Sequence, residues 1–276
     1  MENPASVPTP SRNGWFIRVS WEERRGVAII VTREQWVVIL GDHPLAEEWR
    51  TLCQQIEELR VVELDGCLKR GIEADVIIET TNLDLDKKRK DLLQASPLIG
   101  DDTLILTSVL AVAATEVASW LEERGRHQVM GYATFYPLTK RNIIELAPAF
   151  QTAPAYVDKA RSFLELLGKK TEVVRDETGL VFPRILAMII NEAAFAYMEG
   201  TAAAEDIDLA MRLGTNYPQG PLSWADEIGL DDVYAVLTGL HRALGEERYR
   251  PAPILRKMVL AGWLGKKSGK GFYTYV

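Results

Sequence analysis

The spacing of apolar residues changes partway along this chain of 276 residues, and the change limits the folds that it can adopt. From about residue 14 to residue 170, short β-branched runs alternate with segments whose apolar residues recur every three or four positions. Beyond residue 179 only the helical spacing remains. Alternating strands and helices are typical of a parallel sheet with helices on its faces. We therefore expect a doubly wound α/β domain over residues 14–176 and an all-helical domain over residues 177–276.

The expected elements follow from these two periodicities. The expected strands of the first domain are residues 27–31, 36–40, 60–64, 75–79, 103–106, 128–131, 143–146 and 171–174. The expected helices are residues 45–59, 85–94, 114–123 and 155–167, followed in the second domain by 180–198, 204–213, 222–228, 231–244 and 253–261. Residues 15–21 and 27–31 predict a hairpin ahead of the sheet. Residues 1–13, rich in Pro and Ser, are expected to form a disordered lead.

Charge and cysteine content argue against several classes of function. A net charge of −7 disfavours binding to nucleic acid, because affinity for the phosphate backbone comes from clustered Lys and Arg. The only cysteines, Cys53 and Cys67, have no metal-ligand spacing and are expected to be reduced thiols. No apolar run approaches the ~20 residues that span a bilayer. The N-terminus lacks the pattern of a secretory signal. We expect a soluble cytoplasmic protein with no metal, membrane or nucleic-acid partner.

The turn after the strand at residues 36–40 determines whether a dinucleotide can bind. A Rossmann-type turn needs glycine at three places, for the tight turn, for approach of the pyrophosphate and for helix packing. Gly41 fills the first position, but His43 and Ala46 stand at the other two. An imidazole there would obstruct a pyrophosphate unless the loop is rearranged. Asp65, after the next strand, is the candidate for the ribose hydroxyls, although Asp is also a common turn residue. The connection that follows it is very short for a helix.

Several short motifs run through the helical half in a fixed order. They are Gly179-Leu-Val-Phe-Pro-Arg184, Asn191-Glu192-Ala193, Pro218-Gln219-Gly220-Pro221, Ile228-Gly229-Leu230-Asp231 and Gly271-Phe272-Tyr273. Together they resemble the C-terminal domain of the L-3-hydroxyacyl-CoA dehydrogenase (3-hydroxybutyryl-CoA dehydrogenase) family. The resemblance implies a helical domain that forms a homodimer and closes over the acyl chain of a substrate.

The α/β half resembles the same family more loosely, so that the resemblance covers residues 36–276. It rests on residues 74–79, on Leu85-Asp86-Lys87-Lys88, on Thr115-Glu116-Val117-Ala118, and on Gly131 with Phe135 and Pro137. The resemblance implies a Rossmann-like domain with NAD as cofactor. Its candidate cofactor-binding residues in this chain are Gly41, Asp65, Glu79 and Lys88.

The residues that carry the family's reaction are mostly replaced. A family member oxidises a 3-hydroxyacyl thioester with a His base that a Glu orients. The resemblance places Ala133 at the His and keeps the Glu as Glu145. It places Pro183 at an active-site Asn and Leu110 at a catalytic Ser. Ser108 could act in place of that Ser only after a shift of two residues. Glu145 and Ser108 are therefore the candidate catalytic residues.

Three functions remain open at this stage. The leading hypothesis is a divergent family member in fatty-acid and acyl-CoA metabolism, with weak or lost dehydrogenase activity and possible acyl-CoA binding in the interdomain cleft. An active NAD-dependent dehydrogenase would need another base, such as Thr134 or Tyr136, and a rearranged site. A noncatalytic dimerising subunit would use only the helical half.

Overall fold

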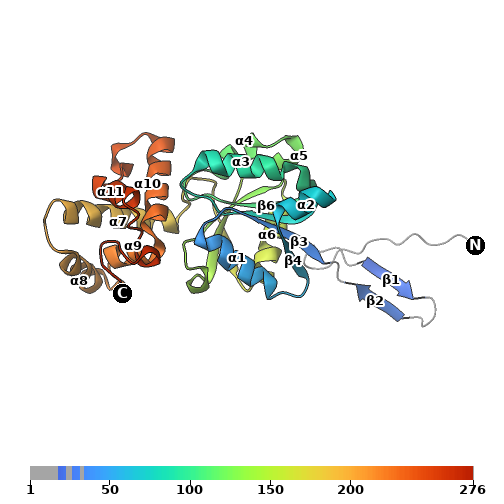
Figure 1. Cartoon of the computed structure of the whole chain (residues 1–276), viewed down its shortest axis with the longest axis horizontal. Helices are drawn as coiled ribbons and strands as arrows, with labels where there is room; N and C mark the ends of the chain where they lie inside the picture. The colour runs from blue at the N-terminus through green and yellow to red at the C-terminus, as the bar shows by residue number, and fades with distance from the viewer. Residues whose placement is uncertain (1–17, 23–26, 32–33, 276) are drawn as a thin grey trace, which may run out of the picture.

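The sheet domain and the helical domain lie end to end (Figure 1). The structure is a computed structural model that describes residues 18–22, 27–31 and 34–275. The last strand, β9 (Lys170–Val173), and the first helix of the second half, α7 (Phe182–Met198), are joined by a short connection. The change from mixed to helical structure thus falls where the apolar spacing predicts it.

Seven strands form the main sheet, in the order β4-β3-β5-β6-β7-β8-β9. All neighbouring strands are parallel except β7 and β8, which are antiparallel. The sheet is therefore Rossmann-like and doubly wound, as the sequence predicts. Besides β9 its strands are β3 (Gln35–Leu40), β4 (Leu59–Val62), β5 (Ala74–Glu79), β6 (Ile99–Ser108), β7 (Val129–Ala133) and β8 (Ile143–Pro148).

Helices cover both faces of this sheet because its buried strands are apolar on both sides. One face packs against α1 (Pro44–Gln54) and α6 (Ala155–Leu166), and its core includes Trp49 and Phe163. The other face packs against α3 (Leu85–Ala95) and α4 (Ala114–Trp120). The core of this second face continues into the helical domain, where it includes Leu186 and Val236.

Several expected elements differ from the structure in extent or in type. The strand expected at residues 60–64 ends at Val62, and a two-turn helix, α2 (Leu64–Arg70), lies in the connection that is expected to be too short for a helix. Gly71 makes this possible because it ends the helix in the left-handed conformation. The helix expected at residues 114–123 is broken at Leu121, whose backbone is extended, and resumes as α5 (Glu123–Arg126). The helix expected at residues 45–59 ends at Gln54.

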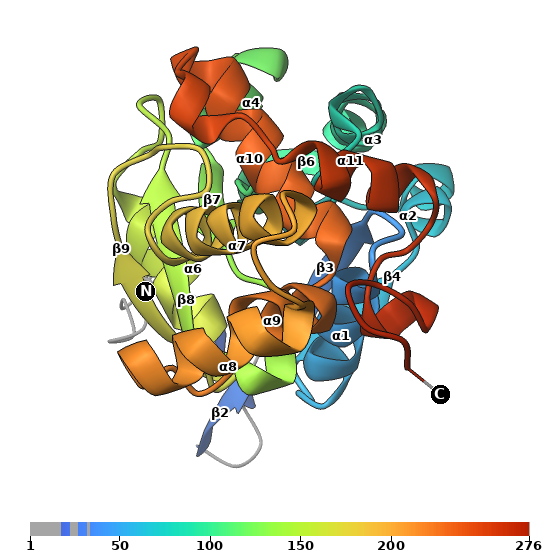
Figure 2. The same ribbon diagram turned by 90° about the vertical axis from the view of Figure 1, so that its left-hand side faces the viewer.

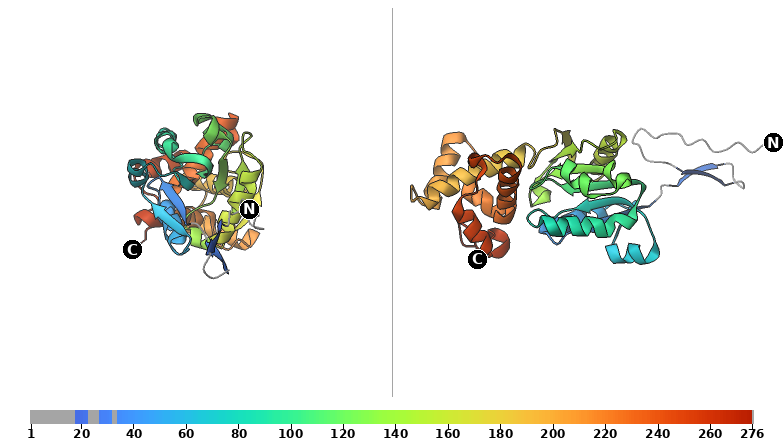
Figure 3. Two further views of the ribbon diagram at one scale, coloured as in Figure 1. Left: turned by 90° about the vertical axis from the view of Figure 1, so that its right-hand side faces the viewer. Right: turned by 90° about the horizontal axis from the view of Figure 1, so that it is seen from above.

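The expected N-terminal hairpin is confirmed in its backbone pairing over the described residues, whereas residues 15–17 of its expected first strand lie outside them. Strand β1 (Arg18–Glu22) runs antiparallel to β2 (Val27–Val31), with Arg18 opposite Val31. It lies at the end of the sheet domain opposite the helical domain (Figures 1 and 3). The expected lead at residues 1–13 lies outside the described residues.

The helical domain is built around α7. Viewed from the helical end, α8 and α9 lie on one side of α7, and α10 and α11 on the other (Figure 2). These helices are α8 (Ala204–Thr215), α9 (Pro221–Ile228), α10 (Leu230–Leu244) and α11 (Pro253–Leu260). Among the described helices, none is long and apolar enough to cross a membrane.

The C-terminal tail is fastened to the helical domain by one carboxylate. Buried Asp226 accepts hydrogen bonds from the N–H groups of Phe272 and Tyr273, each at 2.9 Å, and from the Tyr275 hydroxyl at 3.0 Å. A Cβ atom at Gly271 would lie only 1.9 Å from the Asp226 carboxylate. Glycine is therefore required at that position for the tail to approach.

Candidate active site at the domain junction

The three positions where the resemblance implies a base, an amide and a hydroxyl are buried and apolar. Ala133 ends β7, is 3% exposed, and pairs across the sheet with Glu145 of β8. Leu110 follows β6 and is fully buried, and Pro183 is buried in the first turn of α7. Ala133 and Leu110 belong to the core shared by both domains. Neither position offers a side chain that can accept a proton or bind a developing charge.

Glu145 lies beside Ala133, but its carboxylate is bound by two backbone N–H groups. Its two oxygens accept hydrogen bonds from the backbone N–H groups of Val181 at 2.8 Å and Phe182 at 2.9 Å. These are the first N–H groups of α7, which have no partner within the helix. A negative charge at this end of a helix is also favoured by the helix dipole. Glu145 thus caps the first helix of the second domain from a strand of the first.

Ser108, the second candidate catalytic residue, lies in a chain of buried hydrogen bonds that crosses between the domains. Its hydroxyl donates to the Asn82 side-chain oxygen at 2.6 Å. The Asn82 amide in turn donates to a carboxylate oxygen of Asp232, in the first turn of α10, at 2.8 Å. All three side chains are almost fully buried. Ser108 therefore helps to join β6 to the helical domain.

Glu79 and Lys88 form an ion pair that is fully buried. The Lys88 ammonium also donates to the carbonyl oxygens of Thr81 at 3.0 Å and Ser108 at 2.8 Å, so its three donors are all used. Glu79 accepts a further hydrogen bond from the Thr107 hydroxyl at 2.9 Å. Burial lowers the pKa of Lys88, and the neighbouring Glu79 opposes that shift. The structure brings these two predicted residues together and gives the pair a role in joining β5 to β6.

The turn after β3 keeps one feature of a phosphate-binding turn. Gly41 has a φ of 101°, and a Cβ atom there would lie 2.5 Å from the Thr80 hydroxyl, so glycine is required. His43 then forms the N-cap of α1, where its Nδ1 accepts the backbone N–H of Leu45 at 3.1 Å. The imidazole therefore covers the helix N-terminus, which is the part of such a turn that binds an anion.

The other imidazole nitrogen faces the second domain. His43 Nε2 lies 3.2 Å from a carboxylate oxygen of Asp232, although the two groups lack the alignment of a hydrogen bond. Burial is the largest single effect on the pKa of His43 and lowers it, but the combined effects of Asp232 and Asp231 raise the pKa overall. Burial raises the pKa of Asp232, but His43 lowers it, and the net shift is downward. These opposite shifts are those of an ion pair.

These residues do not fit a dinucleotide in its usual pose. The N-terminus of α1 is capped by His43, and the space beyond it holds the Asp232 carboxylate. A pyrophosphate placed there would meet a negative charge and a bulky ring instead of free N–H groups. Asp65, the candidate for the ribose, lies exposed in the first turn of α2, and no described hydrogen bond or ion pair joins it to the buried cluster.

Close backbone contacts also hold the two domains together. A Cβ atom at Gly239 of α10 would lie 2.4 Å from the carbonyl oxygen of Ala111, in the loop after β6. The Arg242 guanidinium donates to that same oxygen at 3.0 Å, and the Gly179 N–H donates to the Val109 carbonyl at 2.7 Å. The loop after β6, where the resemblance places a catalytic Ser, is therefore packed directly against α10.

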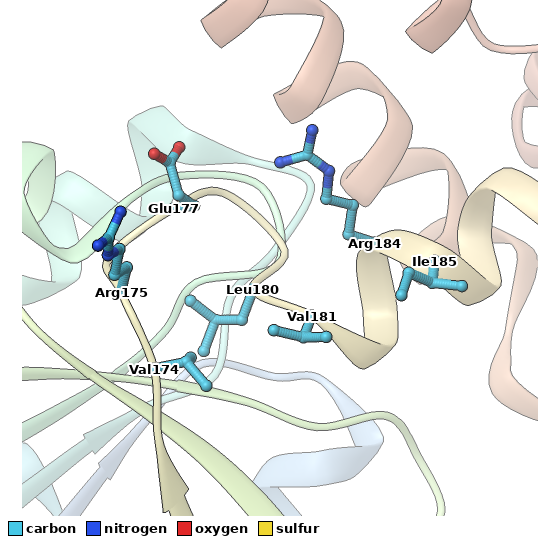
Figure 4. Close-up of a pocket in the computed structure, with 7 residues that line it drawn as sticks. All are labelled: Val174, Arg175, Glu177, Leu180, Val181, Arg184 and Ile185. Atoms are coloured by element: carbon cyan, nitrogen blue, oxygen red, sulfur yellow. The ribbon is translucent and has the colours of Figure 1, made fainter.

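Two hollows lie beside this junction. The first, of about 420 Å³, lies at the start of α7. Figure 4 shows Leu180, Val181 and Val174 around it and the charged ends of Arg175 and Arg184 nearby. The second, of about 250 Å³, is lined by Tyr136, Pro137, Lys140, Glu227, Lys266 and Lys267. Among the described residues, no group of three His, Cys, Asp or Glu side chains could hold a metal ion.

Two polar residues of the junction, Asn82 and Asp232, are missing from the sequence prediction. Asp232 is one of two acidic residues in the first turn of a helix, where negative charge is favoured anyway, so its type gives no distinct signal. Its partners Asn82 and His43 lie far away in the sequence. Only the position of His43 at a glycine site indicates that this turn departs from the usual pattern.

Comparisons with known proteins agree with the class that the fold indicates, a two-domain protein with a Rossmann-like domain and a helical domain. The family model for the C-terminal domain of 3-hydroxyacyl-CoA dehydrogenase matches residues 179–275. The model for the NAD binding domain of 3-hydroxyacyl-CoA dehydrogenase matches residues 50–177, beyond the turn that contains Gly41 and His43.

Individual relatives belong to the same family. The chain is 35% identical over 214 residues to a probable 3-hydroxybutyryl-CoA dehydrogenase of Bacillus subtilis, covering 78% of this chain and 74% of the relative. It is 36% identical over 204 residues to a probable 3-hydroxybutyryl-CoA dehydrogenase of Deinococcus radiodurans, covering 74% of this chain and 72% of the relative. The crystal structure of (S)-3-hydroxybutyryl-CoA dehydrogenase PaaH1 from Ralstonia eutropha matches with a TM-score of 0.67 and 28% identity, covering 88% of this chain and 99% of that one.

The chain belongs to the 3-hydroxyacyl-CoA dehydrogenase family. NAD is the cofactor of that family. The family resemblance of the sequence is thus confirmed. The candidate site residues of this chain, however, mostly make buried contacts within or between the two domains.

Proposed function

We propose that this protein is a divergent member of the family, acting in fatty-acid and acyl-CoA metabolism, whose dehydrogenase activity is weak or lost. One observation carries the proposal. Ala133 stands where a base would act, and the carboxylate of neighbouring Glu145 is bound by the N–H groups that begin α7. A carboxylate that caps a helix is not free to orient an imidazole, and no imidazole stands beside it. We also infer a cytoplasmic location.

We also propose that the protein binds an acyl-CoA. The hollow at the start of α7 supports it, because Leu180, Val181 and Ile185 offer an apolar surface for a hydrocarbon chain. Arg175 and Arg184, which also line the hollow, could pair with phosphate groups of the CoA part.

A thermal-shift comparison with NAD, NADP and an acyl-CoA tests this proposal. A ligand that binds the folded state raises the unfolding temperature with its concentration. We expect stabilisation by acyl-CoA and none by NAD or NADP. Stabilisation by NAD would support an active dehydrogenase instead, and the absence of any effect would support a purely structural role.

A noncatalytic dimerising subunit is the second candidate, and exposed apolar residues of the helical domain favour it. Ile185 of α7 is 56% exposed, and Leu209 and Leu213 of α8 are 50% and 77% exposed. Exposed apolar side chains of this kind are typical of a protein interface. We propose that they form the contact of a homodimer.

Light scattering at micromolar concentration should therefore report about twice the chain mass of 30.9 kDa. Replacing Ile185 and Leu213 by Asp should give monomers, because each charge would be buried in the contact. Leu260→Asp is the matched control, since Leu260 is 74% exposed but lies on α11. A wild-type protein that is strictly monomeric would contradict the dimer.

A further inference from the structure

We propose that the Asp232 carboxylate occupies the place where the phosphates of a dinucleotide would bind, and that Asp232 and His43 together exclude NAD from the cleft. The helical domain would thus bring its own negative charge to the place where the cofactor's phosphates would bind. The inference concerns the same site as the proposed function, but it is about binding and does not depend on whether the chemistry is lost.

The geometry of the carboxylate carries the first part of the argument. Asp232 belongs to α10 of the helical domain, yet both of its oxygens are engaged by residues of the sheet domain. One oxygen lies 3.2 Å from His43 Nε2, and the other accepts the Asn82 amide at 2.8 Å. The His43 ring stands between this carboxylate and the N-terminus of α1, because its other nitrogen accepts a hydrogen bond from the Leu45 N–H. An anion at this end of a helix is the arrangement that phosphate binding uses.

The charge balance around the carboxylate carries the second part. Asp232 is matched by His43, and the adjacent Asp231 is matched by Lys267, whose ammonium lies 2.6 Å from it. Lys267 and Asp231 also act electrostatically on His43. His43 and Lys267 are therefore each paired with a carboxylate, so that neither offers an unpaired positive charge to a phosphate.

Displacement of Asp232 is disfavoured by burial. Its side chain is 2% exposed, and that of His43 is 11% exposed. If a dinucleotide pushed the carboxylate aside, His43 would lose the opposite charge of its ion pair and the Asn82 amide would lose its hydrogen-bond acceptor, in a site largely shielded from water. Buried polar groups without partners are unfavourable, so the contact with Asp232 is expected to persist when NAD is added.

Calorimetric titration with NAD tests this inference on the full chain. We compare the wild type with His43→Gly/Asp232→Ala, which restores a glycine to the turn and removes the carboxylate, and with the milder Asp232→Asn. We expect a dissociation constant above about 1 mM for the wild type. The double variant should bind at least about 10-fold more tightly, with Asp232→Asn in between. Asp206→Asn, at an exposed position on α8, is the control and should behave like the wild type.

Circular dichroism first establishes that each variant is folded. If the double variant does not fold, the wild type and Asp232→Asn still decide the question. Wild-type binding of NAD tighter than roughly 100 μM would overturn the inference, as would folded variants that bind no better than the wild type. NAD binding without NADH formation overturns this inference alone, whereas sustained NADH formation overturns the proposed function.

Discussion

With NAD and 3-hydroxybutyryl-CoA, the purified protein should form NADH at or below about 1 s⁻¹. Loss of a positioned general base typically costs on the order of 10²–10⁴ in rate. Enzymes with a complete site commonly turn over at ~10–10³ s⁻¹. Ala133 removes the base, and Pro183 and Leu110 remove an amide and a hydroxyl. Losses within one catalytic unit do not add, so the second and third replacements need not slow the reaction much further.

NADH absorbance measures this rate, with 3-hydroxybutyryl-CoA and a longer-chain homologue as substrates. Ala133→His should not restore activity by itself, because Glu145 remains bound to the N–H groups of Val181 and Phe182. Sustained turnover well above about 1 s⁻¹ that is abolished by Glu145→Gln would show that another residue acts as the base.

Gly239→Ala should destabilise the protein by up to about 2 kcal/mol, although alanine is the better helix former. The gain in helix propensity is about 1 kcal/mol. The added Cβ atom, however, would lie 2.4 Å from a backbone oxygen of Ala111, and a backbone contact cannot be relieved by turning a side chain. Overpacking of this kind costs about 1–3 kcal/mol and occasionally more, so we expect the clash to outweigh the propensity.

Chemical denaturation measures this effect, and Gly214→Ala is the matched control. Gly214 lies on exposed α8, and nothing lies within 4 Å of its added Cβ atom. The control should therefore gain up to about 1 kcal/mol. If Gly239→Ala were as stable as Gly214→Ala, the tight contact between α10 and the loop after β6 would be wrong.

Much of the fold could be predicted because its signals are local. The run at residues 74–79 is apolar over most of its length, and it forms the buried central strand β5. The helix α2 differs from the expectation because the connection is short: Leu64, Cys67 and Leu68 have helical spacing, but over two turns only. The break at Leu121 was missed because the apolar spacing continues across it.

The site could be predicted only in part. The family resemblance at Gly131, Phe135 and Pro137 places Ala133 on its strand, and the structure adds that the sheet register sets it opposite Glu145. The new role of Glu145 as the cap of α7 depends on tertiary contacts that leave no pattern in the sequence. The same is true of Asp232 and Asn82, which meet across 150 positions of the chain.

We expect the two domains to be fixed relative to each other without a cofactor, and a distance measured between them tests this expectation most directly. Spin labels can be attached at Asp158→Cys of α6 and Glu247→Cys after α10, because both side chains are 83% exposed. The native Cys53 and Cys67 are buried and should not react. Labelled chains diluted with unlabelled protein report only the distance within one chain. We predict one narrow distance distribution that does not change when NAD and 3-hydroxybutyryl-CoA are added. A broad distribution that narrows on their addition would show a cleft that closes on its ligands and would contradict the account.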